Sequence, residues 1–209
     1  MTTDAKPYAI DTPAALEALY DAPGEVSLRK EVPYLHPVYQ ALIAASPFAI
    51  LASIGPDGLD TSPRGDPPGF VHVQDEHTLL LPERRGNNRI DSLRNIVADP
   101  RVALLFLIPG AGETLRVNGR ARISIAPHLL ERFSMQGKLP KCVLEISVVS
   151  VFFQCARAIH RSQLWEPRPD GWRPPVPSAG AIVEALTNCD IDAATYDDDL
   201  PARQRASLY

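Results

Sequence analysis

The stretch Leu79–Pro100, LLLPERRGNNRIDSLRNIVADP, carries an apolar strand through a basic, Asn-rich turn into an amphipathic helix. Apolar residues recur at helical spacing after the turn, which predicts a helix over 88–98 that ends before the proline. These residues are Ile90, Leu93, Ile96 and Val97. Asn87 or Asn88 can cap this helix, and Asp91 falls in its first turn.

The turn before this helix suits a phosphate group. Free backbone N–H groups point outward from a helix N-terminus, and the helix dipole adds roughly 0.5–2 kcal/mol for an anion. Arg84, Arg85 and Arg89 would surround that anion, each charge-assisted hydrogen bond being worth about 1.5–3 kcal/mol. The alternative is a solvated basic loop that only caps a helix, since Asn caps and surface arginines are common.

Composition favours a globular domain that binds a small anion. The chain has 209 residues, 45% of them hydrophobic, and a net charge of −4, which argues against general nucleic-acid binding. No apolar stretch is long enough to span a bilayer and the N-terminus lacks a secretory pattern, so we expect a cytoplasmic protein without a membrane partner. The three cysteines are widely spaced and are expected to be reduced thiols, with neither a disulfide nor a zinc site.

Short strand-like segments follow one another along the middle of the chain. They cover 47–54, 59–65, 70–74, 78–82, 101–108, 114–125 and 142–158, and helices are predicted over 12–20, 37–46, 88–98 and 127–136. Regular βαβ alternation is missing, so we predict a mainly β (α+β) fold, a closed or nearly closed antiparallel barrel with peripheral helices. We divide the chain into a helical extension (1–34), the barrel (35–165) and a Pro-rich arm with a short helix near 181–186 and an acidic tail (166–209).

Two segments offer further polar side chains. In strand 114–125 the two-residue period places Arg116, Asn118, Arg120 and Arg122 on one face and Leu115, Val117, Ala121, Ile123 and Ile125 on the other. The polar face is either solvated or lines a subunit interface beside a ligand, and Arg116 is kept as a candidate ligand residue. The segment 62–69, SPRGDPPG, crowds Ser62, Arg64 and Asp66 among turn residues, where they could meet a ligand or simply form a β-turn.

Familiar catalytic motifs are missing from the sequence. It contains no Gly-x-Gly-x-x-Gly turn, Walker loop or Gly-x-Ser-x-Gly elbow, and no side-chain nucleophile or acid/base pair stands out, so no catalytic residue is assigned. The histidines are scattered, which predicts no metal site, and Glu83, Asp91 and Glu113 are expected to cap helices or face solvent. The difficult chemistry of an enzyme built this way would be carried by a bound cofactor.

The order of these motifs resembles the pyridoxamine 5'-phosphate oxidase-like flavoproteins. The resemblance rests on SPRGD, LLLP, ERRGNNR, ADP and RVALLFLI, with PGAGETLRVNGRA and FQCARAIHRSQLWEP pointing to one FMN-binding branch, and it covers roughly 35–170. It implies a split β-barrel homodimer with FMN at the subunit interface. Ser62, Arg64, Gly65 and Asp66 would then approach the flavin or ribityl chain, Leu81 and Pro82 would lie along the cofactor, and Asn88 and Arg89 would hold the phosphate.

The sequence also departs from the authentic oxidase. Asn88–Arg89 stands where that enzyme has an Arg-Lys pair, and Arg161 and Trp165 are either loose analogues of its substrate-binding motif or residues of a surface helix. We therefore carry over FMN binding and not the vitamin B6 reaction. The complete candidate set for the cofactor is Ser62, Arg64, Gly65, Asp66, Leu81, Pro82, Arg84, Asn87, Asn88, Arg89, Arg116 and Arg161.

The resulting prediction is an FMN-dependent oxidoreductase acting on a small substrate that the sequence does not name. Three alternatives on the same fold stay open. One is a non-catalytic flavin carrier or sensor, the second is a haem-binding module with His160 as an axial ligand, and the third is a deazaflavin-dependent reductase.

Overall fold

A computed structural model of the chain describes residues 8–209, which divide into a unit ending at Glu31 and a unit comprising Val32–Tyr209. The first unit contains α1 (Pro13–Glu17) and α2 (Glu25–Arg29). Thr12 caps α1 as predicted, its side chain accepting a hydrogen bond from the Ala15 N–H at 3.2 Å. The sequence predicted no helix at α2.

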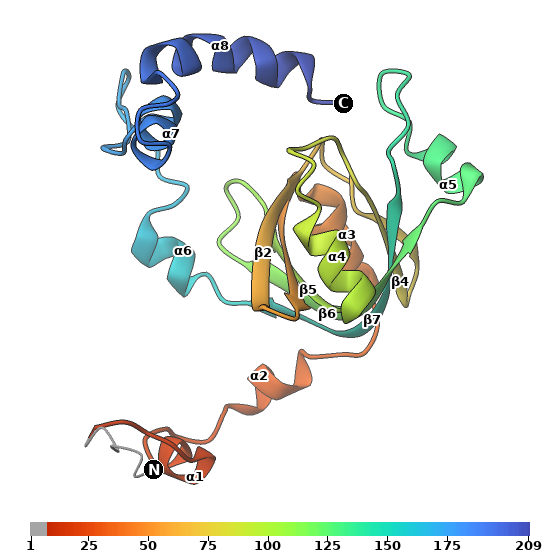
Figure 1. The fold of residues 1–209 in the computed structure, drawn as a ribbon. Coiled ribbons are helices and arrows are strands. Elements are labelled where there is room, and N and C mark those ends of the chain that lie inside the picture. The colour runs from red at the N-terminus through yellow and green to blue at the C-terminus, as the bar shows by residue number, and fades with distance from the viewer. Residues whose placement is uncertain (1–7) are drawn as a thin grey trace, which may run out of the picture. The chain divides into compact units, whose positions relative to one another are not determined.

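A single antiparallel sheet of seven strands dominates the second unit (Figure 1). The strands are β1 (Phe48–Gly55), β2 (Gly58–Gly65), β3 (His72–Asp75), β4 (Thr78–Pro82), β5 (Arg101–Leu107), β6 (Thr114–Ser124) and β7 (Val143–Gln154). They are ordered β2-β1-β5-β6-β7-β4-β3, so β2 and β3 are edge strands that do not pair with each other. The α+β class and the antiparallel pairing are confirmed, while the sheet is open as in a split barrel and is not closed.

Alternating burial along the strands builds the core on one face of the sheet. Leu51, Leu104 and Phe106 are fully or almost fully buried, and their strand neighbours are more exposed. The helices α3 (Pro37–Ala45) and α4 (Asp91–Ala98) contact the sheet, α4 against β1, β2 and β6. The predicted faces of 114–125 are correct except at Ile125, which lies beyond the end of β6 and is 72% exposed.

A bulge in the pairing of β6 with β7 requires a glycine at position 119. The register shifts between Asn118 and Gly119, and a Cβ at Gly119 would lie 2.6 Å from the Ser147 carbonyl oxygen. Backbone approaches this close exclude every larger residue.

The remaining helices are α5 (Pro127–Arg132), α6 (Arg157–Ser162), α7 (Ala179–Leu186) and α8 (Ala193–Ala206). The predicted strand 142–158 was too long, because α6 begins at Arg157. The acidic tail contains α8, a helix that the sequence did not predict. Asp192 caps α8 by accepting from the Thr195 N–H, and Asp197 accepts from the Gly180 N–H at the start of α7. Acidic side chains at helix N-termini therefore account for part of the tail's composition.

Three further findings concern residues 8–209 as a whole. The cysteines form no disulfide, and no cluster of three or more His, Cys, Asp or Glu side chains in this range could hold a metal ion. In the same range, every helix is too short or too polar to span a bilayer.

Candidate functional site

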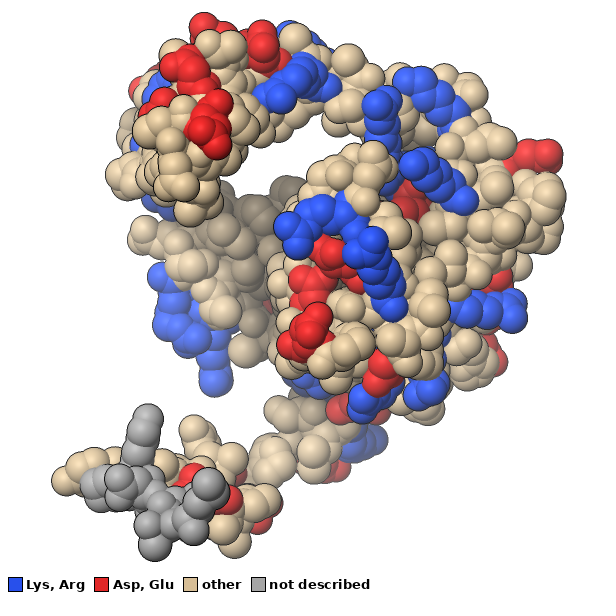
Figure 2. All heavy atoms as spheres, in the orientation of Figure 1, with Lys and Arg blue, Asp and Glu red and all other residues tan. Residues whose placement is uncertain are grey.

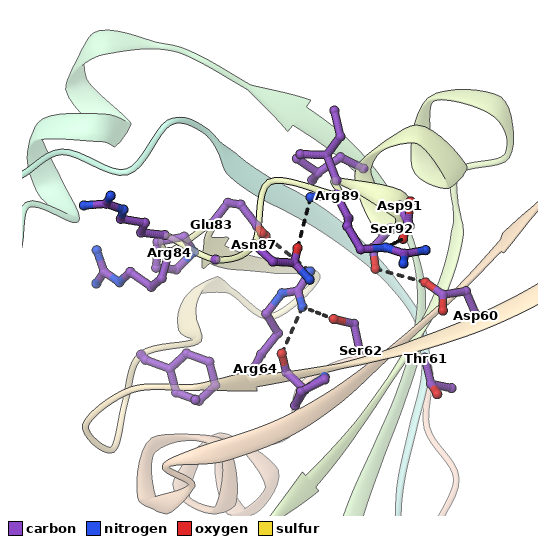
Figure 3. A pocket seen from close by; sticks show the side chains of 18 residues that line it. Asp60, Thr61, Ser62, Arg64, Glu83, Arg84, Asn87, Arg89, Asp91 and Ser92 are labelled. Carbon is purple, nitrogen blue, oxygen red and sulfur yellow. Dashed lines mark hydrogen bonds and ion pairs between the residues drawn. The ribbon is translucent and has the colours of Figure 1, made fainter. Parts of the chain in front are cut away.

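A cavity of about 410 Å³ opens between the end of β2 and the loop that joins β4 to α4 (Figure 3). Cavities of this size hold cofactors and drug-sized ligands in other proteins. The lining residues are Asp60–Gly65, Phe70, Pro82–Asn87 and Arg89–Leu93. A strand edge, a basic loop and a helix N-terminus thus meet at one place.

The cavity brings together the larger part of the predicted cofactor set. Its members in the lining are Ser62, Arg64, Gly65, Pro82, Arg84, Asn87 and Arg89. Asn88 lines a neighbouring cavity, and Leu81 is fully buried in the core. Asp66 lies behind the lining, where it binds Arg84.

The two remaining candidates lie elsewhere on the described chain. Arg116 is half-buried on β6, with its guanidinium 4.0 Å from the centre of the Phe152 ring, and it does not line the cavity. Arg161 lies on α6, outside the cavity lining. Within one chain, neither residue joins the site.

Arg64 is the most enclosed cation of the cavity. Its Nη1 donates hydrogen bonds to Ser62 Oγ at 2.6 Å and to the Pro63 carbonyl oxygen at 2.9 Å, and its side chain is only 14% exposed. Its Nε is buried without a hydrogen-bond partner among the described residues. The predicted strand over 59–65 is confirmed, because Ser62–Gly65 belong to β2 and pair with Phe48–Leu51 of β1. The alternative of a β-turn at these residues is therefore wrong.

Glu83 faces Arg64 across the floor of the cavity. Its Oε2 lies 3.4 Å from Arg64 Nη2, an ion-pair distance without hydrogen-bond geometry, and this oxygen has no hydrogen bond within residues 8–209. Burial raises the pKa of this carboxyl, and the nearby Arg64 charge opposes the rise. The expectation that Glu83 caps a helix or faces solvent was wrong. Its position directly after the buried run TLLLP was the available signal.

Arg84 holds the cavity wall together. Its Nε donates to Asp66 Oδ2 at 2.6 Å and its Nη1 donates to the Phe133 carbonyl oxygen at 2.6 Å, while Asp66 is nearly buried. The prediction that Arg84 would surround an anion needs correction, since its charge is already paired. Arg84 anchors the basic loop to the end of β2 and to the segment after α5.

The loop before α4 has an unusual backbone. Asn87 Oδ1 accepts a hydrogen bond from the Arg89 N–H at 3.0 Å, and both Asn88 (φ 62°) and Ile90 (φ 55°) adopt the left-handed conformation. A β-branched residue rarely adopts this conformation. The sequence predicted an Asn cap, but α4 begins at Asp91 with Ile90 at the cap position and no side-chain cap.

This backbone leaves the N-terminus of α4 facing the cavity. The first N–H groups of a helix have no partner within the helix, and a left-handed residue followed by a helical one turns successive N–H groups toward a common point. Arg89 adds an exposed cation, and its Nε donates to Asp91 Oδ2 at 2.8 Å in a pair whose side chains are 74% and 42% exposed. The hydrogen bond to Asp91 raises the pKa of Arg89, which stays fully charged.

Carboxylates also enter the lining. Asp60 Oδ2 accepts a hydrogen bond from Ser92 Oγ at 3.4 Å and fixes the first turn of α4 against β2 (Figure 3). Asp60 was not predicted as a site residue, because only the packing of α4 against β2 brings it beside Ser92. Asp60, Glu83 and Asp91 partly balance the four arginines of the lining, so the site is polar and only mildly cationic.

Residues 35–155 match the family described as "Pyridoxamine 5'-phosphate oxidase". The chain belongs to this family. The matched region includes every strand and the whole lining of the cavity. A search of curated proteins gave no match.

Several solved structures resemble the chain at low sequence identity. HupZ of Group A Streptococcus is 19% identical, with a TM-score of 0.46, over 56% of this chain and 90% of that chain. A putative pyridoxamine 5'-phosphate oxidase from Lactobacillus delbrueckii is 19% identical, with a TM-score of 0.46, over 58% of this chain and 95% of that one. General Stress Protein 26 from Bacillus anthracis is 14% identical, with a TM-score of 0.37, over 54% and 88% of the two chains.

Proposed function

We propose that this protein is an FMN-binding oxidoreductase that acts on a small substrate. The observation that carries the proposal is the cavity between β2 and the uncapped N-terminus of α4, lined by arginines within the family-matched region. Membership of the family alone does not fix the activity, since one fold hosts several functions.

The residues of the cavity fit FMN in polarity. A phosphate needs several donors, and the N-terminus of α4 offers backbone N–H groups beside Arg89 and Asn87. A flavin ring and ribityl chain need polar partners on a mainly fixed surface, and Arg64 lines the cavity with a guanidinium that Ser62 and Pro63 hold in place. Ser62, Gly65 and Pro82 would complete that surface, with Asp66 and Leu81 supporting it from behind.

The cofactor and the protein would contribute different parts of the reaction. Bound FMN would supply the electron-transfer chemistry, and the protein would position the ring and exclude water. Arg64 is held by Ser62 and Pro63 before any ligand arrives, so little side-chain entropy is lost when it binds. In the proposed homodimer with FMN at the subunit interface, Arg116 and Arg161 would contribute from outside the cavity of one chain.

The visible absorption spectrum of freshly purified protein tests the proposal. We expect flavin bands that match FMN after heat release, saturable binding of added FMN to the stripped protein, and bleaching of the bound flavin by a reductant. A colourless protein that does not bind added FMN would overturn the proposal. A Soret band would point to the haem-binding alternative instead, and tight binding of a deazaflavin with weak binding of FMN would point to the third alternative.

A further inference from the structure

The helix α4 is tied to the β1–β2 hairpin by two polar contacts. Asn95 Nδ2 donates a hydrogen bond to Ser53 Oγ at 3.1 Å. Ser92 Oγ donates one to Asp60 Oδ2 at 3.4 Å. Ser53 and Asp60 are direct partners in the pairing of β1 with β2, and the two helix residues lie three positions apart. Residues at either spacing are about 5 Å apart, so the two contacts form side by side.

The contact between Ser53 and Asn95 is closely packed. Ser53 is only 2% exposed, and Asn95 is half-buried. Gly55 leaves room for the Asn95 amide, because a Cβ on Gly55 would lie 2.0 Å from Asn95 Oδ1. A buried hydroxyl or amide without a hydrogen-bond partner is strongly unfavourable. The contact therefore favours a single placement of Asn95 on β1.

The other contacts of α4 are less directional. Ile96 packs into the core, but hydrophobic contact alone does not fix the direction in which a helix lies. In the orientation of Figure 1, where α4 lies at the front of the barrel, Figure 2 shows Lys and Arg side chains beside Asp and Glu side chains over this face. Exposed charge pairs contribute little to stability. The two polar contacts with the hairpin are therefore what set the register of α4.

The register of α4 matters because its N-terminus meets the cofactor cavity. The helix begins at Asp91 without a side-chain cap, and Ser92 in its first turn lines the cavity. Asp60 lies on the same face of β2 as Arg64, because side chains four positions apart point to one side of a strand. The contacts thus fix the first N–H groups of α4 relative to the Arg64 guanidinium.

We infer that Ser53 and Asn95 are positioning residues that give the site its preference for a phosphorylated flavin. Neither residue lines the cavity, so both act through the N-terminus of α4. Hydrogen bonds weaken steeply when donor and acceptor are misaligned, so a small shift of the helix takes backbone donors away from the phosphate. The ring and ribityl chain, which lie against β2, are affected less. The inference rests on the proposed function for the identity of the ligand.

Fluorescence titration with FMN and with riboflavin tests the inference, because the two flavins differ only in the phosphate group. We expect Ser53→Ala to bind FMN about tenfold more weakly than the wild type, as for loss of a charge-assisted hydrogen bond, and to bind riboflavin with nearly unchanged affinity. Gly55→Ala should lower the preference for FMN to a similar extent. Its added methyl group displaces the Asn95 amide, while Ser53 keeps its hydroxyl.

Ser46→Ala is the matched control. Ser46 is fully buried at the end of α3, and its Oγ lies 2.7 and 2.8 Å from the carbonyl oxygens of Phe48 and Leu107. This variant also loses a buried hydroxyl, so it should melt at a lower temperature, but it should keep the wild-type preference for FMN. Amide hydrogen exchange across 91–98 without flavin, measured at the same interval below each melting temperature, should be faster in Ser53→Ala than in Ser46→Ala.

Several outcomes would overturn the inference. They are a wild type with equal affinity for both flavins, an equal loss of FMN and riboflavin affinity in Ser53→Ala, and an equal loss of preference in Ser46→Ala. A wild type that binds neither flavin would reject the proposed function and the flavin preference with it, while faster exchange in Ser53→Ala would still support the positioning of α4. A wild type that prefers FMN, with preference and exchange unchanged in Ser53→Ala, would reject the inference and retain the proposed function.

Discussion

The core of the sheet and the loop Glu83–Ile90 are built on opposite principles. In the core, side chains such as Leu104 and Phe106 are almost completely buried and alternate with more exposed neighbours. In the loop, polar side chains predominate, and Asn88 and Ile90 adopt left-handed conformations. Burial therefore fixes the sheet, whereas the loop keeps exposed donors and a strained backbone that suit a ligand. Stability and binding should be separable by mutation.

Phe106→Ala should produce the largest loss of stability. Phe106 is fully buried on β5 between Ala49 of β1 and Leu115 of β6, so truncation leaves a cavity and costs about 3–5 kcal/mol of unfolding free energy. Urea denaturation measures this loss, and Val149→Ala, at a side chain 55% exposed, should change stability by less than about 0.5 kcal/mol. The folded fraction of Phe106→Ala should bind FMN with unchanged affinity. A parallel loss of affinity would mean that core and loop are coupled.

Arg89→Ala should show the reverse pattern. We expect FMN binding to weaken by about 1.5–3 kcal/mol, because the variant loses a charge-assisted contact at the proposed phosphate site. The unfolding free energy should barely change, since the exposed Arg89–Asp91 pair contributes little to stability. Fluorescence titration of FMN gives the affinity, and Arg120→Ala serves as the control with a smaller effect. Unchanged affinity in Arg89→Ala would remove this residue from the site.

Ile90→Asn should stabilise the protein by about 1 kcal/mol, because Asn tolerates the left-handed conformation that Ile90 adopts. Ile90 is 48% exposed, so little burial is lost. Thermal unfolding measures the gain. The matched control is Val97→Asn in the same helix, at a side chain 78% exposed, which should give no gain. Equal effects at both positions would show that the backbone of Ile90 is not strained.

The sequence predicted the sheet well because strand periodicity reports burial. All seven strands fall within the predicted segments, apart from a residue at an end, and Thr12 caps α1 as expected. The edges of the sheet were harder to predict. The sheet closes into a barrel only if β2 and β3 pair with each other, and the sequence of neither strand shows whether they do. The helix in the tail was not predicted because its segment is rich in acidic residues, among which the two capping side chains do not stand out. Asp192 caps α8, and Asp197 accepts from the first turn of α7.

Side-chain partners in the site could be predicted only where they are close in sequence. The basic loop was found from its composition, but the assignment of the cap to Asn87 or Asn88 was wrong because Asn87 bonds to Arg89 instead. Arg84 pairs with Asp66 across 18 positions and bonds to Phe133 across 49. Distances of this kind depend on the fold, which is also why Asp60 was missed and the place of Glu83 was misjudged.

Glu83 lies where the two regions meet, directly after β4 and at the start of the loop, and Glu83→Gln should give the smallest effect. Its backbone N–H bonds to the Cys142 carbonyl oxygen, and burial raises its pKa above the ordinary value of 4.5. A carboxyl with a raised pKa in the folded state binds its proton more tightly there than in the unfolded chain. Its contribution is therefore fully present below pH 4.5 and is lost as the pH rises through the raised value.

The unfolding free energy of the wild type should accordingly fall relative to that of Glu83→Gln as the pH rises from 4.5, and the difference should level off above the raised pKa. Urea denaturation of both proteins across this range measures the difference. Glu76→Gln, at a side chain 67% exposed, is the matched control and should run parallel to the wild type. A difference that grows in the opposite direction would show that the Arg64 charge outweighs burial. Glu83 would then belong with the polar loop rather than with the buried end of the sheet.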